Sequence, residues 1–297
     1  MIQIKSDKHV YTFSSENAPV LTVPAGSTVE IETLDCFENQ LRTSEDTLEA
    51  LDWDRTNPVT GPICVEGAAA GDTLKITIEK ILLNEKGTVM CGAGMGTLGH
   101  LLHGNYTKII EIKDNMAQFS PDLKLPLNPM IGVIGAAPEQ GASINTGTPG
   151  HHGGNMDNVM ITEGAVLYIP VFTEGAGFAL GDVHAVMGDG EIGVTGLEIP
   201  AEVTVTLDII KGKAEKEPVL ENNQVWSVIV SRETLDQAAD DATEIMYRFI
   251  ADRCEMTEDT ITMLMSLVGQ LEICQIVDPL KTVRFVIPKQ YFPDIRF

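Results

Sequence analysis

The sequence predicts a mainly β protein: one large β-sandwich or barrel-like domain with a helical hairpin near its C-terminus. Three observations support this fold class. A glycine- or proline-containing turn followed by a strand of alternating apolar and polar residues recurs through the first two thirds of the chain. Apolar residues at helical spacing appear only after residue 230. A strand-like segment then returns near the end, at residues 282–288.

The predicted strands share β-branched residues, period-two alternation and flanking Gly, Pro or Asp, which is the pattern of half-buried strands. They comprise residues 1–5, 28–33, 73–79, 165–172, 203–210 and 282–288. Repetition this frequent is typical of a sandwich or barrel, and its irregular period argues against a solenoid.

Two helices are expected after the strands. Ser231 is the predicted N-cap of the first, whose apolar residues recur three and four positions apart as far as Phe249. Thr257 is the predicted N-cap of the second. Their Met and Phe stripe is typical of core packing. We expect one domain over 1–297, with a β-rich core at 1–230, a helical hairpin at 231–270 and returning strands at 271–297.

Charge and cysteine content exclude several classes of partner. Lys and Arg number 20 against 43 Asp and Glu, a formal net charge of −23. Such acidity without a basic cluster argues against nucleic acid and anionic membranes, whereas a small neutral substrate would not be repelled. The five cysteines form no CxxC pair, which argues against a zinc ribbon or a disulfide framework. With no apolar signal core or membrane-length stretch, we expect a cytoplasmic protein.

Two glycine-rich segments lack clear periodicity. Residues 91–96 superficially suggest a phosphate loop, but no GK[ST] follows, so we exclude a nucleotide site. Residues 128–157 are predicted to form a long loop. Long loops are usually functional or disordered, and the histidines and glycines here favour function.

Histidines and acidic residues gather in three neighbouring motifs. These are His151-His152-Gly153-Gly154-Asn155-Met156-Asp157, Gly181-Asp182-Val183-His184-Ala185 and Gly188-Asp189-Gly190-Glu191. Neutral imidazole and carboxylate together are ligands for a divalent metal. Polar turns between strands have similar composition, but the clustering favours a functional site.

Strand geometry refines this hypothesis. Asp182 and His184 are two residues apart, so they share a strand face and lie about 7 Å apart. Asp189-Gly190 predicts a two-residue hairpin turn that pairs His184 with Thr195. Glu191 would then lie about 13 Å from His184. This distance favours Glu191 as a base acting on water or substrate over a shared metal ligand; the alternative is a charged hairpin tip.

A thiol also stands at the end of a predicted strand. Cys36 follows Glu32 and Asp35 closely. A neighbouring base that lowered its pKa would make Cys36 a nucleophile. A buried, inert cysteine is the commoner alternative.

These motifs resemble the acetamidase/formamidase family of amide hydrolases. The matching pieces, in order along nearly the whole chain, are VEIETLDC at 29–36, NPVTGP at 57–62, VEGA at 65–68, GD at 71–72, HGGNMD at 152–157, GDVHA at 181–185, GDGE at 188–191 and TGLE at 195–198. Their order makes the resemblance specific, although each motif alone is weak.

The resemblance implies hydrolysis of short aliphatic amides, such as formamide or acetamide, to carboxylate and ammonia. It also implies a β-rich fold, a homo-oligomer (a dimer or larger) and a divalent metal, with zinc expected before calcium. Carried over residue by residue, Asp157 and His184 are the first expected metal ligands, then Asp35, and then Asp182 or His152.

The leading hypothesis is amide hydrolysis by a metal-activated water. Glu191 would move a proton to the departing nitrogen, and Gly153, Gly154 and Asn155 would bind substrate, the glycine backbone N–H groups holding the oxyanion. Two alternatives stay open. One is a Cys36-dependent amidase, with Cys36 as the catalytic nucleophile; the other is a non-catalytic β-sandwich that binds a metal or small ligand.

Overall fold

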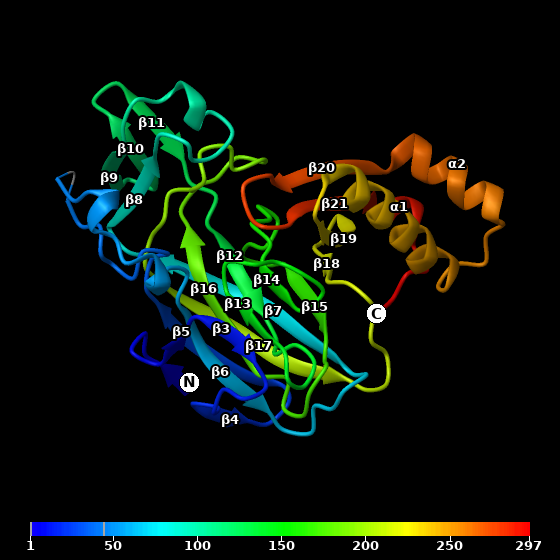
Figure 1. The fold of residues 1–297 in the computed structure, drawn as a ribbon. Coiled ribbons are helices and arrows are strands. Elements are labelled where there is room, and N and C mark those ends of the chain that lie inside the picture. The colour runs from blue at the N-terminus through cyan, green and yellow to red at the C-terminus, as the bar shows by residue number, and fades with distance from the viewer. Residues whose placement is uncertain (1, 44) are drawn as a thin grey trace.

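Two large sheets face each other across an apolar core, and a pair of helices packs on the C-terminal part of the larger sheet (Figure 1). The computed structural model describes residues 2–43 and 45–297. Met1, the first residue of the predicted N-terminal strand, lies outside the described residues. The predicted fold class, mainly β with a C-terminal helical hairpin, is confirmed.

The larger sheet has nine strands, antiparallel except for the first pair. In spatial order they are β1 (Ile2–Ile4), β5 (Ser27–Thr33), β17 (Ala201–Ile210), β7 (Thr73–Leu83), β15 (Val166–Pro170), β18 (Val219–Glu221), β19 (Val225–Arg232), β21 (Lys281–Pro288) and β20 (Gln270–Gln275). The predicted alternation of buried and outward-facing residues is confirmed in β5. This strand buries Val29, Ile31 and Thr33 and turns the residues between them outward.

The second sheet carries the strands of the candidate site. Its strands are β14 (Gly153–Asn155), β12 (Met130–Gly135), β16 (Phe178–His184), β6 (Val59–Val65) and β2 (His9–Val10), with β4 (Leu21–Val23) also paired to β6. Every residue of β12 and β16 is buried. The prediction of one loop over 128–157 is therefore wrong, because a strand buried on both faces shows no polar alternation.

Smaller elements complete the fold. A four-stranded sheet contains β11 (Leu123–Pro126), β10 (Met116–Ser120), β9 (Tyr106–Lys113) and β8 (Lys86–Cys91), and a two-stranded sheet contains β13 (Ser143–Asn145) and β3 (Thr12–Ser14). Short 3-10 turns occupy Leu48–Ala50, Trp53–Arg55, Gly99–Leu101 and Lys289–Tyr291. Among the described residues, no helix has the length and apolar character needed to span a membrane.

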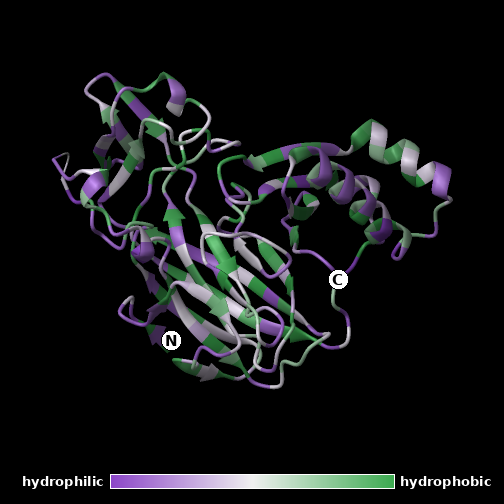
Figure 2. Cartoon of the chain, in the orientation of Figure 1, coloured by the Kyte–Doolittle hydropathy of each residue, from purple (hydrophilic) through white to green (hydrophobic). Residues whose placement is uncertain are grey.

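The main core lies between the two large sheets. Val29 and Ile76 of the nine-stranded sheet belong to the same buried cluster as Ile63 and Leu180 of the second sheet. Each fully buried aliphatic side chain contributes about 1.5–3 kcal/mol. Figure 2 shows hydrophobic and hydrophilic residues alternating along strands of this frame. The sandwich therefore provides a rigid support for the groups at its strand ends.

The helical hairpin comprises α1 (Leu235–Ala251) and α2 (Glu258–Val268), and a second core cluster joins it to the nine-stranded sheet. Thr257 is the N-cap of α2, as predicted. The prediction of Ser231 as the N-cap of α1 is wrong. Ser231 still belongs to β19, where its hydroxyl lies 2.9 Å from that of Thr282, and Thr234 caps the helix instead.

Asp72, part of one matching motif, has a structural role. Its side chain is only 6% exposed, and its carboxylate accepts hydrogen bonds from the Lys211 ammonium at 2.6 Å and the Gly212 backbone N–H at 2.8 Å. Burial alone would raise the pKa of Asp72, but these bonds lower it below its ordinary value. The carboxylate thus ties the turn before β7 to the end of β17.

We expect Asp72→Asn to lower the free energy of unfolding at pH 7 by about 1.5–3 kcal/mol, because charge-assisted hydrogen bonds are lost. Since the folded-state pKa is depressed, this stabilisation is complete above the unfolded pKa of about 4 and is lost as the pH falls through the folded value. Urea unfolding at a series of pH values measures it. The exposed Asp122→Asn is the control; equal stability of wild type and Asp72→Asn at pH 7 would contradict the expectation.

Candidate active site

The candidate site lies where three strands of the second sheet end or are extended by loops. His184 is the last residue of β16, and Asp182 precedes it by two positions. Asp157 follows β14 and enters from the neighbouring edge of β12. All three side chains are buried, with His184 and Asp157 each 1% exposed and Asp182 3% exposed. The structure therefore brings three of the predicted metal ligands together.

The strand register predicted from a two-residue hairpin at Asp189-Gly190 is wrong. The turn itself forms, since the Glu191 N–H donates to the Gly188 carbonyl at 3.2 Å, but no strand of the described residues flanks it directly. The chain leaves β16 in a longer loop, and His184 pairs with Glu198 rather than with Thr195. A tertiary contact also holds the turn. Gly190 donates its N–H to the carbonyl of Cys274 at 2.8 Å, and its own carbonyl accepts from Ile276 N–H at 3.2 Å.

The longer loop changes the position of Glu191. Its carboxyl oxygen, an oxygen of Asp157 and a ring nitrogen of His184 lie within 4.8 Å of one another. The expected distance of about 13 Å, taken from an ideal hairpin, is therefore wrong. Glu191 lies inside the cluster rather than beyond it.

A single imidazole nitrogen is the centre of this cluster. His184 Nε2 lies 3.1 Å from Glu198 Oε2, 3.3 Å from Asp182 Oδ1 and 3.8 Å from Asp157 Oδ1. Asp182 and Glu198 also come within 4.8 Å of the Cys36 thiol. Four carboxyl groups, one imidazole and one thiol thus share a buried space.

Several of these residues hold left-handed backbone conformations. The φ angles are 43° at Asp157, 53° at Asp182 and 46° at Glu191. Such conformations cost of the order of 1 kcal/mol or more for residues with a β-carbon and are typical of functional sites. Here they turn side chains from separate segments toward one point.

Burial and mutual repulsion shift the pKa values of the cluster. Burial, and then the Asp182 carboxylate, raise the pKa of Asp157 to about 6. Burial raises the pKa of Glu198 to about 8, and burial together with Asp157 raises that of Glu191 well above its ordinary range. Burial would lower the pKa of His184, but Glu198 and Asp182 raise it well above its usual value. A bound cation would displace protons from such a cluster.

The donor set fits a divalent cation. Asp157 Oδ1 and His184 Nδ1 are buried and have no hydrogen-bond partner among residues 2–43 and 45–297. The ion pairs recorded for Asp157, Asp182 and Glu198 within the described residues all involve His184. When they are ionised, several buried carboxylates around one imidazole carry more negative charge than the protein balances, which is costly unless a cation is bound. One nitrogen ligand among oxygen ligands favours zinc over calcium, which prefers oxygen alone.

Two glycines, which have no side chain, leave room for this cluster. A β-carbon at Gly132 of β12 would lie 2.5 Å from Asp182 Oδ2 and 2.6 Å from Asp157 Oδ1. A β-carbon at Gly196 would lie 2.6 Å from His184 Nδ1. Both contacts are too short for a real side chain, so glycine at these positions permits the close approach.

Two other predicted metal ligands lie outside the cluster. The Asp35 carboxylate accepts backbone N–H groups of Phe37 at 3.1 Å and Asn39 at 2.6 Å, so it shapes the turn after β5. His152 packs edge-on against Phe13, and burial lowers the pKa of its imidazole to about 4. Neither residue belongs to the two groups of potential metal ligands found among residues 2–43 and 45–297.

The predicted substrate-binding glycines also have other contacts. Side chains at Gly153 or Gly154 would overlap the carbonyl oxygens of Ile134 and Thr148. The Gly153 N–H donates to Gly150 at 3.0 Å and is not free for an oxyanion. Asn155, by contrast, lines the cavity beside the cluster.

Sequence reasoning missed two members of the site. Glu198 was part of a matching motif, but the ideal hairpin placed Thr195, not Glu198, opposite His184. Asp278 lies in the turn between β20 and β21 and lines the same cavity. Burial and the neighbouring Asp157 raise the pKa of Asp278 well above its ordinary value. No local motif marks Asp278, so only its tertiary position reveals it.

The β-hairpin formed by β20 and β21 holds two segments of the site together. The buried Arg284 guanidinium bonds both carboxylate oxygens of Asp189, at 2.9 and 2.6 Å, and the Asn158 amide oxygen at 3.1 Å. Asp189 belongs to the loop of Glu191, and Asn158 follows Asp157 directly. Arg284 therefore fixes two site segments relative to each other.

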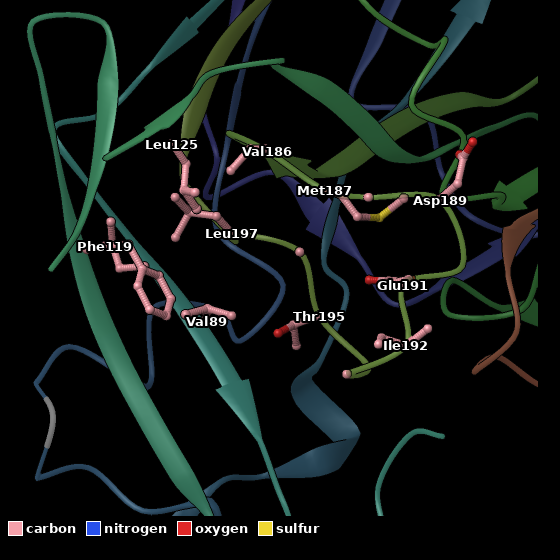
Figure 3. Close-up of a pocket in the computed structure, with 14 residues that line it drawn as sticks. Val89, Phe119, Leu125, Val186, Met187, Asp189, Glu191, Ile192, Thr195 and Leu197 are labelled. Atoms are coloured by element: carbon pink, nitrogen blue, oxygen red, sulfur yellow. The ribbon is translucent and has the colours of Figure 1, made fainter. Parts of the chain in front are cut away.

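Two cavities adjoin the loop that carries Glu191. The one beside the cluster has a volume of about 100 Å³ and is lined by Cys36, Phe37, Asn155, Asp182, Glu191, Glu198 and Asp278, among others. The other, about 410 Å³, is mostly apolar and lies between this loop and the β8–β11 sheet (Figure 3). Glu191 and Thr195 line both cavities.

The chain matches one family of known proteins. The model of the Acetamidase/Formamidase family matches residues 7–146 and 139–235. The chain belongs to this family. The segment that carries Asp278 and Arg284 lies beyond the matched residues.

Individual relatives agree with this assignment. The acetamidase of Mycolicibacterium smegmatis is 27% identical over 268 residues, which cover 68% of this chain and 66% of that protein. The chain thus spans slightly under two thirds of that relative's length. The acetamidase structure from Bacillus halodurans is 42% identical, with a TM-score of 0.97 and full coverage of both chains. The structure of a predicted acetamidase/formamidase from Thermoanaerobacter tengcongensis is 47% identical, with a TM-score of 0.96 and coverage of 100% and 99%.

We expect Gly132→Ala to weaken zinc binding by about 10–100-fold, as does the loss of supporting contacts around a metal site. The added methyl group would push apart the carboxylates of Asp157 and Asp182. Calorimetric titration with zinc measures the effect. Gly104→Ala is the matched control, because its β-carbon would meet the Tyr106 hydroxyl at an ordinary 3.7 Å. Unchanged affinity for added zinc in Gly132→Ala would show that this cluster is not where zinc binds.

Proposed function

We propose that this protein hydrolyses the C–N bond of short aliphatic amides, such as formamide and acetamide, to carboxylate and ammonia. The observation that carries the proposal is the buried cluster of His184 and four carboxyl groups beside a cavity of about 100 Å³. A cavity of this size suits a substrate of a few heavy atoms. Membership of the acetamidase/formamidase family supports the same reaction.

The proposal includes a zinc ion held by Asp157 and His184, with Asp182 or Glu198 as a further ligand. Zinc, when bound, polarises an amide carbonyl and lowers the pKa of a water molecule to about 7. Asp182 and Glu198 lie 3.3 and 3.1 Å from His184 Nε2, close enough to share an ion with it.

Glu191 is the proposed proton carrier. It lies within 4.8 Å of Asp157 and His184 and also lines the cavity, so its carboxyl group can face substrate. Amine is a poor leaving group unless its nitrogen is protonated. A carboxyl group at this point takes a proton from the attacking water and delivers it to the departing nitrogen.

The Cys36 alternative has less support. Burial, and then the carboxylates of Glu198 and Asp182, raise the pKa of the Cys36 thiol well above its usual value. A nucleophilic cysteine needs the opposite environment, in which positive groups lower the pKa. We therefore assign Cys36 a place in the wall of the cavity rather than the role of nucleophile.

The first test is ammonia release from formamide and acetamide by purified protein, before and after chelator treatment and metal add-back. We expect activity to fall to background with chelator and to return with zinc. Activity that resists a chelator, with no metal found by elemental analysis, would contradict the zinc proposal. Absence of ammonia across a panel of amides would favour a non-catalytic β-sandwich that binds a metal or small ligand.

We expect His184→Ala to lose both bound zinc and turnover, because the substitution removes the only imidazole of the cluster. Glu191→Gln should keep the side-chain volume and lower kcat by about 10²–10⁴-fold, the usual contribution of a proton-transfer group. Zinc content and initial rates separate the two roles. Full turnover in His184→Ala would overturn this scheme.

Cys36→Ser and Cys36→Ala distinguish the two enzyme mechanisms. We expect both variants to keep turnover within about tenfold of wild type, because Cys36 forms no bond to substrate in the metal scheme. Zinc content is measured alongside the rates. Loss of turnover in both variants with zinc retained would instead establish Cys36 as the nucleophile.

We also propose that the protein forms a homo-oligomer and that it is located in the cytoplasm, a reducing compartment. All five cysteines are free. β20 is the last strand of the nine-stranded sheet, and its Leu271 and Ile273 are 48% and 43% exposed, near Leu267 of α2 at 79%. Exposed apolar edges are typical of association surfaces. Light scattering of wild type and Leu271→Asp tests for a dimer or larger assembly.

A further inference from the structure

Among the described residues, the lining of the cavity includes a buried amide oxygen without a hydrogen-bond partner. Asn155 is 4% exposed and lines the cavity together with Glu191 and Asp278. Its Nδ2 donates to Asp278 Oδ2 at 2.9 Å. Its Oδ1, at the other end of the amide, has no hydrogen-bond partner. A buried acceptor left unpaired costs about 1–3 kcal/mol, so a ligand that donates a hydrogen bond here is favoured.

Asp278 decides which end of the Asn155 amide is free. The two ends have nearly the same shape, and only their hydrogen-bond partners distinguish them. In the structure the NH₂ end donates to Asp278 Oδ2, and this oxygen can accept even when the other oxygen of the carboxyl group carries a proton. The carbonyl end is then left for the cavity.

The turn that carries Asp278 is held firmly. Gln275, fully buried, accepts the backbone N–H groups of Val277 and Asp278 at 2.9 and 3.0 Å and donates to the Leu280 carbonyl at 2.6 Å. Lys281 donates to the Asp278 carbonyl at 2.6 Å. The same turn is bonded to the Glu191 loop through Gly190. The β20–β21 hairpin therefore fixes the backbone that carries the Asp278 side chain.

We infer that Asp278 is a specificity-determining residue, which orients Asn155 so that Asn155 Oδ1 accepts an N–H of the substrate's amide group. Primary amides carry two such N–H groups and esters of the same size carry none. A site built to pair with an N–H discriminates against an analogue that lacks it, because its own acceptor is then left unpaired. This inference deepens the proposed amide hydrolysis and rests on it for the identity of the substrate.

The test compares acetamide with methyl acetate, a competitor of similar size without an N–H. In the zinc-loaded full-length protein, we expect Asp278→Ala to raise KM for acetamide about fivefold, the equivalent of one hydrogen bond, with little change in kcat. The inhibition constant of methyl acetate should stay within about threefold, since the ester makes no such bond. The exposed Asp294→Ala is the control. A loss of affinity that is equal for both ligands would show a merely structural role and overturn the inference.

A double-mutant cycle tests whether Asp278 acts through Asn155. Asn155→Leu keeps a similar shape and removes the acceptor, and we expect it to raise KM for acetamide about tenfold. Adding Asp278→Ala to this variant should then have no further effect, because the two residues act as one unit. Effects that simply add would contradict the proposed coupling.

Binding measurements separate this inference from the proposed reaction. NMR titration of wild type and Asp278→Ala with acetamide and methyl acetate needs no turnover. If wild type produces no ammonia but prefers acetamide in a manner that depends on Asp278, the proposed hydrolysis fails and the inference stands. If wild type binds both ligands equally, or neither, the inference fails even where ammonia is released.

Discussion

The interaction on which the site depends is the crowding of carboxylates around the imidazole of His184. Asp157, Asp182 and Glu198 all lie within 3.8 Å of His184 Nε2, in a region that water hardly reaches. Like charges this close repel one another strongly in a protein interior, and burial penalises each of them. The surrounding fold must therefore offset the free-energy cost of this arrangement. Bound protons or a bound cation reduce the repulsion.

The sandwich supplies the rigidity that this crowding requires. β12 and β16 are buried along their whole length, so the segments that present Asp182 and His184 are held from both faces. Gly132 brings the backbone of β12 against two carboxylates where a side chain would not fit. Left-handed residues then redirect the chain at the strand ends. Because this frame is rigid, the carboxyl groups that it brings together cannot move apart to reduce their repulsion.

The C-terminal part of the chain completes the site rather than merely covering the sheet. Arg284 ties Asp189 to Asn158, and the turn at Asp278 closes one wall of the cavity. The family match ends at residue 235, so these groups lie in the part of the chain that its model does not describe. The carboxyl groups around His184 thus lie in the matched part of the chain, whereas Asp278 and Arg284 lie beyond it.

The sequence by itself determined the fold class, the helical hairpin and the identity of most chemical groups. Period-two alternation and helical spacing report directly which face of an element is buried, and Asp157, Asp182 and His184 stood in motifs rich in ligand types. Only the tertiary structure decided the register of the loop after β16. The local turn at Asp189-Gly190 forms, but it is bonded to Cys274 instead of joining two paired strands. In this register Glu191 lies in the cluster and Glu198 lies opposite His184. Only the structure places Asp278 in the site, for the same reason: residues far apart in the chain meet only when the sheets have formed.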